Sequence, residues 1–382
     1  GGASTLTFSA LDFALFTDPR GGLDVRDTAD LGVSRKLIFT GLPSGFQPKF
    51  LVGDGKFGAY NATNGIVEFT GYSAAANVGA SAFGDVLRVD AGFGADDISF
   101  DRTLRGLAIT DTTARNVGAS GTAANLTVSS GGILAAGGVT HVLSAPRLNF
   151  VVVTPPSMST LATGNVITVG DTSRLAVGQV VSGTNIPGNS FITEIINGTS
   201  FRINNNTATA GSGNVLTAYA PGYFNVASNT TLDLQGAVVS NSDVIKVGAG
   251  TLLVSAKQYY GGQTTILEGT LKLTAGNNTL FGGAGNILNV ERNGTLDLNG
   301  NLLYASRLRS LGSQAGAGGV ITNSSATPAT FVVGKYDLGF YGSVQGANVN
   351  FASVAGSGSL SISSLQTYGG TTYVSGFRLY LR

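Results

Sequence analysis

The chain has 382 residues, of which only 11% are charged, 57 are glycine and none is cysteine or tryptophan, and its formal net charge is +1. The missing cysteine excludes disulfides, thiolate metal sites and cysteine nucleophiles. Because the charge is near zero and no lysine or arginine cluster occurs, we expect no nucleic-acid partner. A hydrophobic content of 42% is too high for a disordered chain, so we expect it to fold.

Short strings of alternating apolar and polar residues run along the whole chain and predict β-strands. Examples are STLTFSA (4–10), NLTVSS (125–130), TLLVSA (251–256) and SLSISS (359–364), each followed by turn-forming residues. No stretch has helical periodicity across three turns, and no apolar run approaches the about 20 residues that span a bilayer. We therefore expect a nearly all-β protein without a transmembrane segment in this chain.

The start of the chain carries no export or processing signal of its own. It begins at Gly1 without methionine and without a signal-like apolar segment, so we interpret it as a mature or internal piece of a longer protein. The sequence does not identify an anchor or an export route.

The segment GFGADDISFD, which contains Asp96, Asp97 and Asp101, is the first place where chemistry is conceivable. Carboxylate pairs serve polysaccharide-degrading enzymes, and Arg102 and Arg105 follow directly. A solvated strand end explains the same charges, and no tryptophan is present to bind sugar, so we expect no catalytic residue here. The string GFGADD resembles a single calcium-binding Gly-Asp repeat, but such repeats occur in tandem and this one does not. The sequence leaves open whether calcium binds near the three aspartates.

His141 is the only histidine of the chain. A histidine-dependent triad or a multi-histidine metal site is therefore impossible within one chain, and we expect His141 to lie on a strand face. We accordingly expect no bound cofactor and no metal centre.

The segment from Ser157 to Ala220 breaks the surrounding pattern. Strand-like runs alternate there with the turn signals VGD, IPGN and INGT, which predicts a small β-barrel or sandwich inserted into the chain. The predicted division is an N-terminal solenoid part at 1–153, the inserted module at 154–220 and a C-terminal solenoid at 221–382. The module is either a contact surface for a target or a further subunit, or an insertion without a binding role.

Internal repetition defines the rest of the fold. The segment GAGTLLVSAKQYYGGQTTILEGTLKL (248–273) returns in looser form as GSGSLSISSLQTYGGTTYVSGFRLYL (356–381), and NVASNTTLDLQG (225–236) returns as NVERNGTLDLNG (289–300). Leu252 and Val254 recur about one 20-residue coil later as Leu271 and Leu273. Apolar side chains repeated at one angular position are what a β-solenoid buries between neighbouring coils. We expect Thr264 and Thr265 to point outward. We expect Tyr260 with its neighbour Tyr259 to pack at a coil corner, and the alternative is that they stack on a sugar or on a neighbouring protomer.

These segments resemble the autotransporter-associated β-strand repeat, which occurs in passenger regions of very large bacterial surface proteins. The resemblance covers Tyr223 to Arg382, and weaker similarity extends to 57–73 and 123–150. The residues that match the repeat are Gly248, Gly250, Thr251, Leu252, Tyr260, Gly262, Thr264, Thr265, Gly269, Thr270 and Leu271, and in the second copy Gly356, Gly358, Leu360, Tyr368, Gly370 and Gly376. Two departures are Gln263, where the repeat usually has a second glycine, and one residue fewer after Tyr368.

The resemblance implies a right-handed parallel β-helix that is exported and displayed at a bacterial cell surface, and it brings no catalytic residues. The first functional hypothesis is a non-enzymatic structural protein, either a stiff rod or the subunit of an extracellular fibre with homo-oligomeric contacts between its ends. An adhesin or carbohydrate-binding passenger that recognises a cell-surface glycan or protein is the alternative. A β-helix polysaccharide-degrading enzyme is the third.

Overall fold

The structure is a computed structural model, and it describes residues 4–8, 22–26, 30–40, 42, 44–82, 84–94, 98, 100–118, 124–153, 158–160, 163–172, 175, 177–280, 286–335, 339–354, 359–362, 364–375 and 378–381. Its fold is all-β with essentially no helix and contains a parallel β-solenoid of about 13 turns, as the strand pattern and the repeats predict. The only helical element in these ranges is the 3-10 turn η1 (Val78–Ala80). None of the described residues form a helix long and apolar enough to cross a membrane.

The chain divides into two compact units. Unit 1 comprises Gly1–Asp111, Ser120–Ala136 and Asn149–Tyr223, and unit 2 comprises Thr112–Ala119, Gly137–Leu148 and Phe224–Arg382. The predicted division at residues 153 and 220 stays a prediction.

The first part of unit 1 has three sets of paired strands. These strands are β1 (Ser4–Phe8), β2 (Leu23–Val25), β3 (Arg35–Phe39), β4 (Gly45–Val52), β5 (Phe57–Asn61), β6 (Gly65–Glu68), β7 (Val86–Val89), β8 (Arg102–Ile109) and β10 (Asn125–Ala135). The sets are β1 with β3, β2 with β4 to β6, and β7 with β8 and β10. Strands β7, β8 and β10 stack in parallel, so Leu87, Leu107 and Ile133 form one fully buried interior row. Strand β2 is parallel to β4, and β4, β5 and β6 pair antiparallel.

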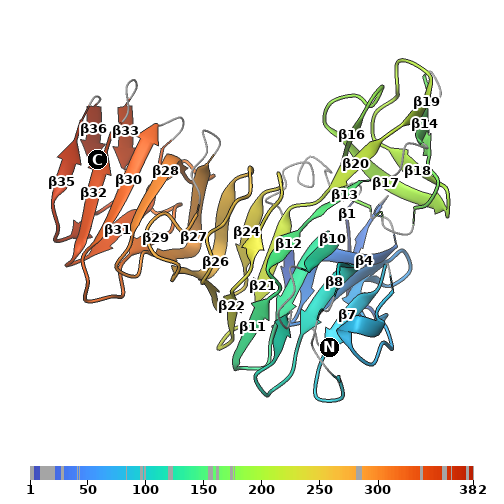
Figure 1. The fold of residues 1–382 in the computed structure, drawn as a ribbon, viewed down its shortest axis with the longest axis horizontal. Helices are drawn as coiled ribbons and strands as arrows, with labels where there is room; N and C mark the ends of the chain where they lie inside the picture. Colours follow the sequence, from blue (N-terminus) through green and yellow to red (C-terminus); the bar gives the residue numbers. More distant parts are fainter. Residues whose placement is uncertain are drawn as a thin grey trace. The chain divides into compact units, whose positions relative to one another are not determined.

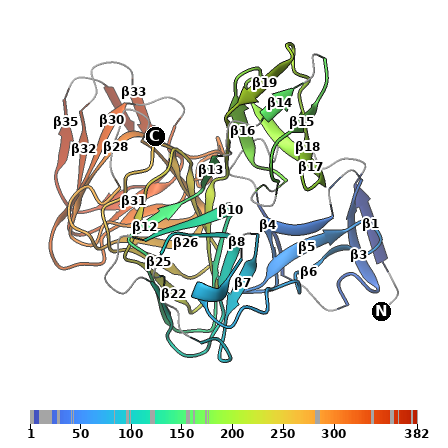
Figure 2. The same ribbon diagram turned by 45° about the vertical axis from the view of Figure 1, so that its right-hand side comes forward.

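An antiparallel sheet covers the outer side of these first coils. Phe46 and Phe57 of this sheet, with rings 5.1 Å apart, pack against Val86, Ala108 and Leu134. These three residues alternate with the interior positions of β7, β8 and β10 and therefore point the other way. Both faces of the first coils are thus apolar and buried. Figure 2 shows β4, β5 and β6 side by side in blue.

The second half of unit 1 is an eight-stranded antiparallel sheet, in the order β13-β20-β16-β17-β18-β15-β14-β19. The bounds are β13 (Val151–Val153), β14 (Met158–Thr160), β15 (Val166–Thr168), β16 (Val180–Gly183), β17 (Ser190–Asn197), β18 (Ser200–Ile203), β19 (Gly211–Asn214) and β20 (Leu216–Tyr219). It has its own apolar core, which includes Met158, Ile167 and Phe201. This sheet lies where the sequence predicts a small β module.

Unit 2 is a parallel solenoid, whose strands run side by side from yellow to red in Figure 1. Its strands are β9 (Asn116–Gly118), β11 (Thr140–Ser144), β12 (Arg147–Asn149), β21 (Gly222–Val226), β22 (Thr231–Leu234), β23 (Ala237–Val238), β24 (Val244–Val247), β25 (Thr251–Val254), β26 (Thr264–Leu273), β27 (Ile287–Asp297), β28 (Leu302–Arg309), β29 (Val320–Thr322), β30 (Ala329–Lys335), β31 (Ser343–Gly346), β32 (Val349–Ser353), β33 (Ser359–Ile362), β34 (Thr367–Tyr368), β35 (Thr372–Val374) and β36 (Arg378–Leu381).

The interior of unit 2 consists of continuous apolar rows. Leu232, Leu252, Leu271, Leu296 and Ile321 lie in register on successive strands and are at most 1% exposed. Val254 and Leu273 form the neighbouring row, as predicted. Each coil therefore buries its apolar side chains against the coils on either side.

Candidate functional site

The repeated segments of unit 2 contain the site residues predicted from the sequence. In the copy at 248–273, Gly248 and Gly269 have φ of +76° and +71°, a region that favours glycine. At Gly250 and Gly262, a β-carbon would collide with backbone atoms of the preceding coil. In the copy at 356–381, Gly356, Gly358 and Gly376 lie outside the described residues, and Leu360 lies on β33.

The two copies share a tyrosine–threonine pair that closes the corner. The hydroxyl groups of Tyr260 and Thr264 lie 2.5 Å apart, and those of Tyr368 and Thr372 lie 2.6 Å apart. Tyr260 is 8% exposed and therefore packs at the corner as predicted, and burial raises its pKa. The same prediction is wrong for Tyr259, which is 57% exposed.

Glutamine side chains brace both corners, and the sequence reasoning missed them. Gln258 accepts a hydrogen bond from the Val238 N–H at 2.9 Å and donates to the Gly236 carbonyl of the preceding coil. Gln366 likewise accepts from the Val344 N–H at 2.7 Å and donates to Gly342 O. Each amide also donates to the carbonyl two residues before it. The signal available in the sequence was a glutamine at the same place in both copies.

The predicted outward position is wrong for Thr264. This residue is in register with Val244 and Leu288 of the apolar interior and is fully buried, because its hydroxyl is satisfied by Tyr260 rather than by solvent. Thr265 points to the opposite face by strand alternation, but Asn289 covers it and donates a 3.0 Å hydrogen bond to its hydroxyl.

Lys246 is a buried cation that the sequence reasoning also missed. It lies in register with Ile266, is 0% exposed, and donates to the carbonyls of Val247, Gly248 and Glu268 at 2.9, 2.6 and 3.0 Å. Burial lowers the pKa of Lys246 to about 7, and the negative charge of Glu268 offsets part of that effect. All three donors of the ammonium group are used, so Lys246 joins two coils rather than facing a ligand.

The residues at which the sequence makes chemistry conceivable are only partly within the described ranges. Asp96 and Asp97 lie outside the described residues, whereas the Asp101 carboxylate accepts hydrogen bonds from the Asn125 N–H and side-chain amide. Arg102 donates to the carbonyls of Gly79 and Ser81. His141 lies on β11 as predicted and is fully buried.

Metal ligands are not gathered anywhere in the described part of the chain. No group of three or more histidine or acidic side chains there could hold a metal ion. The acidic side chains of the repeats serve the fold instead. Ser255 donates to Asp233 one coil away, and the equivalent Asp297 accepts from the Ser324 N–H and hydroxyl at 2.9 and 2.5 Å. These hydrogen bonds and the ammonium of Lys272 lower the pKa of Asp297 against the opposing effect of its burial.

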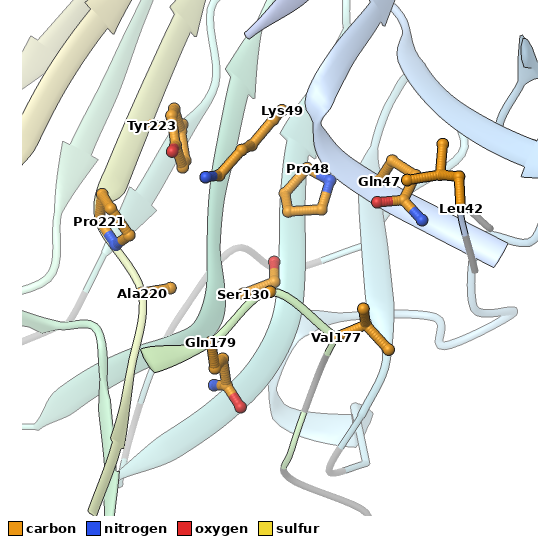
Figure 3. Close-up of a pocket in the computed structure, with 11 residues that line it drawn as sticks. Leu42, Gln47, Pro48, Lys49, Ser130, Val177, Gln179, Ala220, Pro221 and Tyr223 are labelled. Atoms are coloured by element: carbon orange, nitrogen blue, oxygen red, sulfur yellow. The ribbon is translucent and has the colours of Figure 1, made fainter. Parts of the chain in front are cut away.

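Unit 1 contains a small, partly open cavity, shown in Figure 3. Its volume is about 30 Å³, and its lining includes Gln47, Lys49, Gln179 and Tyr223. The Lys49 side chain extends toward Tyr223, with its nitrogen 5.3 Å from the ring centroid. This volume holds about one water molecule, so the cavity is too small for an organic ligand.

A much larger groove, of about 800 Å³, lies elsewhere in unit 1. Its described lining is Ser44, Arg105, Thr172, Leu175, Val177, Thr193, Glu194, Ile195, Asn197 and Gly198. Strand β8 supplies Arg105, and β17 supplies the run from Thr193 to Asn197. The size of this groove suits a small-molecule or saccharide ligand.

The chain matches no protein-family model, no curated protein and no solved structure. Its class therefore rests on its own geometry, which is that of a β-solenoid repeat protein.

Proposed function

We propose that the chain is a non-enzymatic structural segment of an exported bacterial surface protein, of the kind whose autotransporter-associated repeats its sequence resembles. It acts as a stiff rod, or as the subunit of an extracellular fibre built by end-to-end contacts between coils. The β-helix fold fits a structural or an adhesin-like passenger domain. The continuous interior rows and the cross-coil hydrogen bonds support the structural role, because they resist bending between coils.

The observation that carries this proposal is the difference between inner and last coils. Strand β27 covers the inner corner, and Thr264 is consequently fully buried. In the last repeat, β35 pairs with β32, and no other pairing partner of β35 occurs in the described ranges. Tyr373 and Val374 on this strand are 55% and 51% exposed. Exposed apolar side chains on this strand are suited to pack against a further coil, which in the proposed fibre belongs to a second copy.

Electron microscopy of the purified chain, together with analytical ultracentrifugation over a concentration series, tests the proposal. We expect rods that lengthen into fibres as concentration rises. The variant Tyr373→Lys with Val374→Lys should shorten them, because charge on the strand edge opposes stacking. Val33→Lys, at an exposed valine of unit 1, is the control and should assemble normally.

Two results would contradict the proposal. A compact monomer at every concentration would exclude the fibre, and degradation of a polysaccharide substrate panel by the purified chain would exclude the non-enzymatic role.

A further inference from the structure

The groove of unit 1 contains an arginine without a charged partner. Arg105 lies on β8, and its Nε is buried and makes no hydrogen bond in the described part of the chain. No described carboxylate forms an ion pair with it, and burial alone lowers its pKa. Its nearest described aromatic contact is Phe46, whose ring centroid lies 5.6 Å from the guanidinium carbon.

An unpaired guanidinium in this position is costly for the fold. Its Nε is buried without a partner, and a buried donor that is left unsatisfied destabilises a fold in general, more so on a charged group. The other arginines near these strands are engaged, since Arg88 pairs with Asp90 at 2.9 Å and Arg102 donates to backbone carbonyls. Arg105 therefore has hydrogen-bond donors and a charge that no described neighbouring side chain satisfies.

The chemistry of the groove defines what could use that capacity. The planar guanidinium fork matches a carboxylate, which it binds through two parallel hydrogen bonds. The rest of the lining offers hydroxyl and amide groups on Ser44, Thr172 and Asn197 beside the apolar Leu175 and Ile195. Sugar rings present the same combination of hydroxyl groups and C–H faces.

The volume of the groove and the charges of its lining restrict the class of ligand further. A lone small carboxylate would leave most of the about 800 Å³ empty, whereas a short oligosaccharide fills such a space. Glu194 also lines the groove and forms an ion pair with Arg202 at 3.0 Å. Because Arg202 already pairs with Glu194, Arg105 is the charged residue of the described lining that has no ion-pair partner, and the carboxylate of the ligand belongs there.

We propose that this groove binds a carboxylated oligosaccharide, with one uronate carboxylate on Arg105 and neighbouring sugar rings against β17. This binding role is independent of the proposed rod or fibre, because it requires unit 1 alone to present the groove. It gives the chain an adhesive function in addition to a structural one.

Isothermal titration calorimetry on the full chain tests the proposal, with trigalacturonate as the probe and galactotriose as the uncharged probe of equal length. We expect trigalacturonate to bind and galactotriose not to bind detectably. Arg105→Met should weaken trigalacturonate binding at least about tenfold, the usual effect of losing a charged hydrogen-bonded pair. Arg88→Met removes the same charge from the neighbouring strand β7 and should bind as the unaltered chain does.

Thermal unfolding of the same variants distinguishes a binding residue from a structural one. Arg105→Met should unfold at the same temperature as the unaltered chain or above it, because the variant no longer buries an unpaired charge. A lowered unfolding temperature together with unchanged trigalacturonate affinity would assign Arg105 to the fold and overturn the proposal.

A second pair of variants tests the groove without touching Arg105. Gly198 lines the groove and has open space around it, so Gly198→Trp should fill the groove and weaken binding at least about tenfold. Gly188 is equally open but does not line the groove, and Gly188→Trp is the matched control.

Three outcomes would overturn the proposal. They are equal binding of trigalacturonate and galactotriose, no binding of either, and equal affinities for monomeric galacturonate and trigalacturonate. The last of these would assign the site to a small carboxylate rather than to a saccharide chain.

Discussion

The two copies of the corner motif have the same hydrogen bonds and different surroundings. Gln258 and Gln366 brace the preceding coil in the same way, and each tyrosine reaches the threonine four residues later. The inner threonine is nevertheless fully buried, whereas Thr372 is exposed. The comparison separates two contributions to a solenoid corner: the local motif and the preceding coil specify its geometry, and the following coil provides burial.

The largest expected difference between the copies concerns the tyrosines. Tyr260→Ala should reduce the local free energy of unfolding by about 3–5 kcal/mol, the usual cost of deleting a buried aromatic side chain. Tyr368→Ala should cost about 1 kcal/mol, because this tyrosine is only partly buried. Hydrogen exchange of the amides in each coil, followed by mass spectrometry, measures both values. Equal losses would show that the following coil contributes little.

Substitution of the corner glycines, unlike that of the tyrosines, should cost the same stability in both copies. A β-carbon on Gly262 would collide with the Ser242 carbonyl, and one on Gly370 with the Val349 carbonyl, so both clashes are with the preceding coil. Gly262→Ala and Gly370→Ala should therefore each destabilise their coil by about 2–3 kcal/mol, a typical cost of overpacking. Gly188→Ala, in open space, should change the stability by less than about 0.5 kcal/mol. A large loss at Gly262 with none at Gly370 would contradict the comparison.

The apolar interior could be predicted from the sequence because short strings of alternating apolar residues indicate it. Alternating leucines recur at the spacing of one coil, and Leu252 indeed lies against Leu271. Thr264 could not be placed this way, since a polar residue enters the interior only when a partner such as the Tyr260 hydroxyl meets it there. A lone lysine such as Lys246 is likewise interpreted as exposed from sequence.

The groove depends on contacts between distant parts of the sequence. In the sequence, Arg105 follows the carboxylates around Asp96. In the structure, Arg105 shares a groove with β17, which lies far along the chain. Pairing between strands determines such a site, and no local spacing encodes it. The Gln258 and Gln366 pair, by contrast, was detectable by aligning the two copies.

Lys246 provides a predicted effect on stability that depends on pH. The position equivalent to Lys246 in the last copy is Ser353, because Lys246 pairs with Ile266 and Ser353 pairs with Val374, the matching residue of the next strand. Ser353 is fully buried but uncharged, so only the inner copy has a buried cation. An unfolded lysine has a pKa of about 10.4, and burial lowers that of folded Lys246 to about 7. Between these pH values the unfolded chain binds one more proton than the folded chain, so the contribution of Lys246 to stability rises with pH.

This contribution should have a slope of up to about 1.4 kcal/mol per pH unit between about pH 7 and pH 10 and should level off below pH 7. Urea unfolding monitored by circular dichroism across this range measures the total slope, and the difference between the unaltered chain and Lys246→Met isolates the contribution of this one group. Lys246→Met should also lower the stability at pH 7 by about 2 kcal/mol, because three carbonyls lose their donor. An identical pH dependence in the two proteins would mean that Lys246 stays charged throughout, held by its three carbonyls and by Glu268.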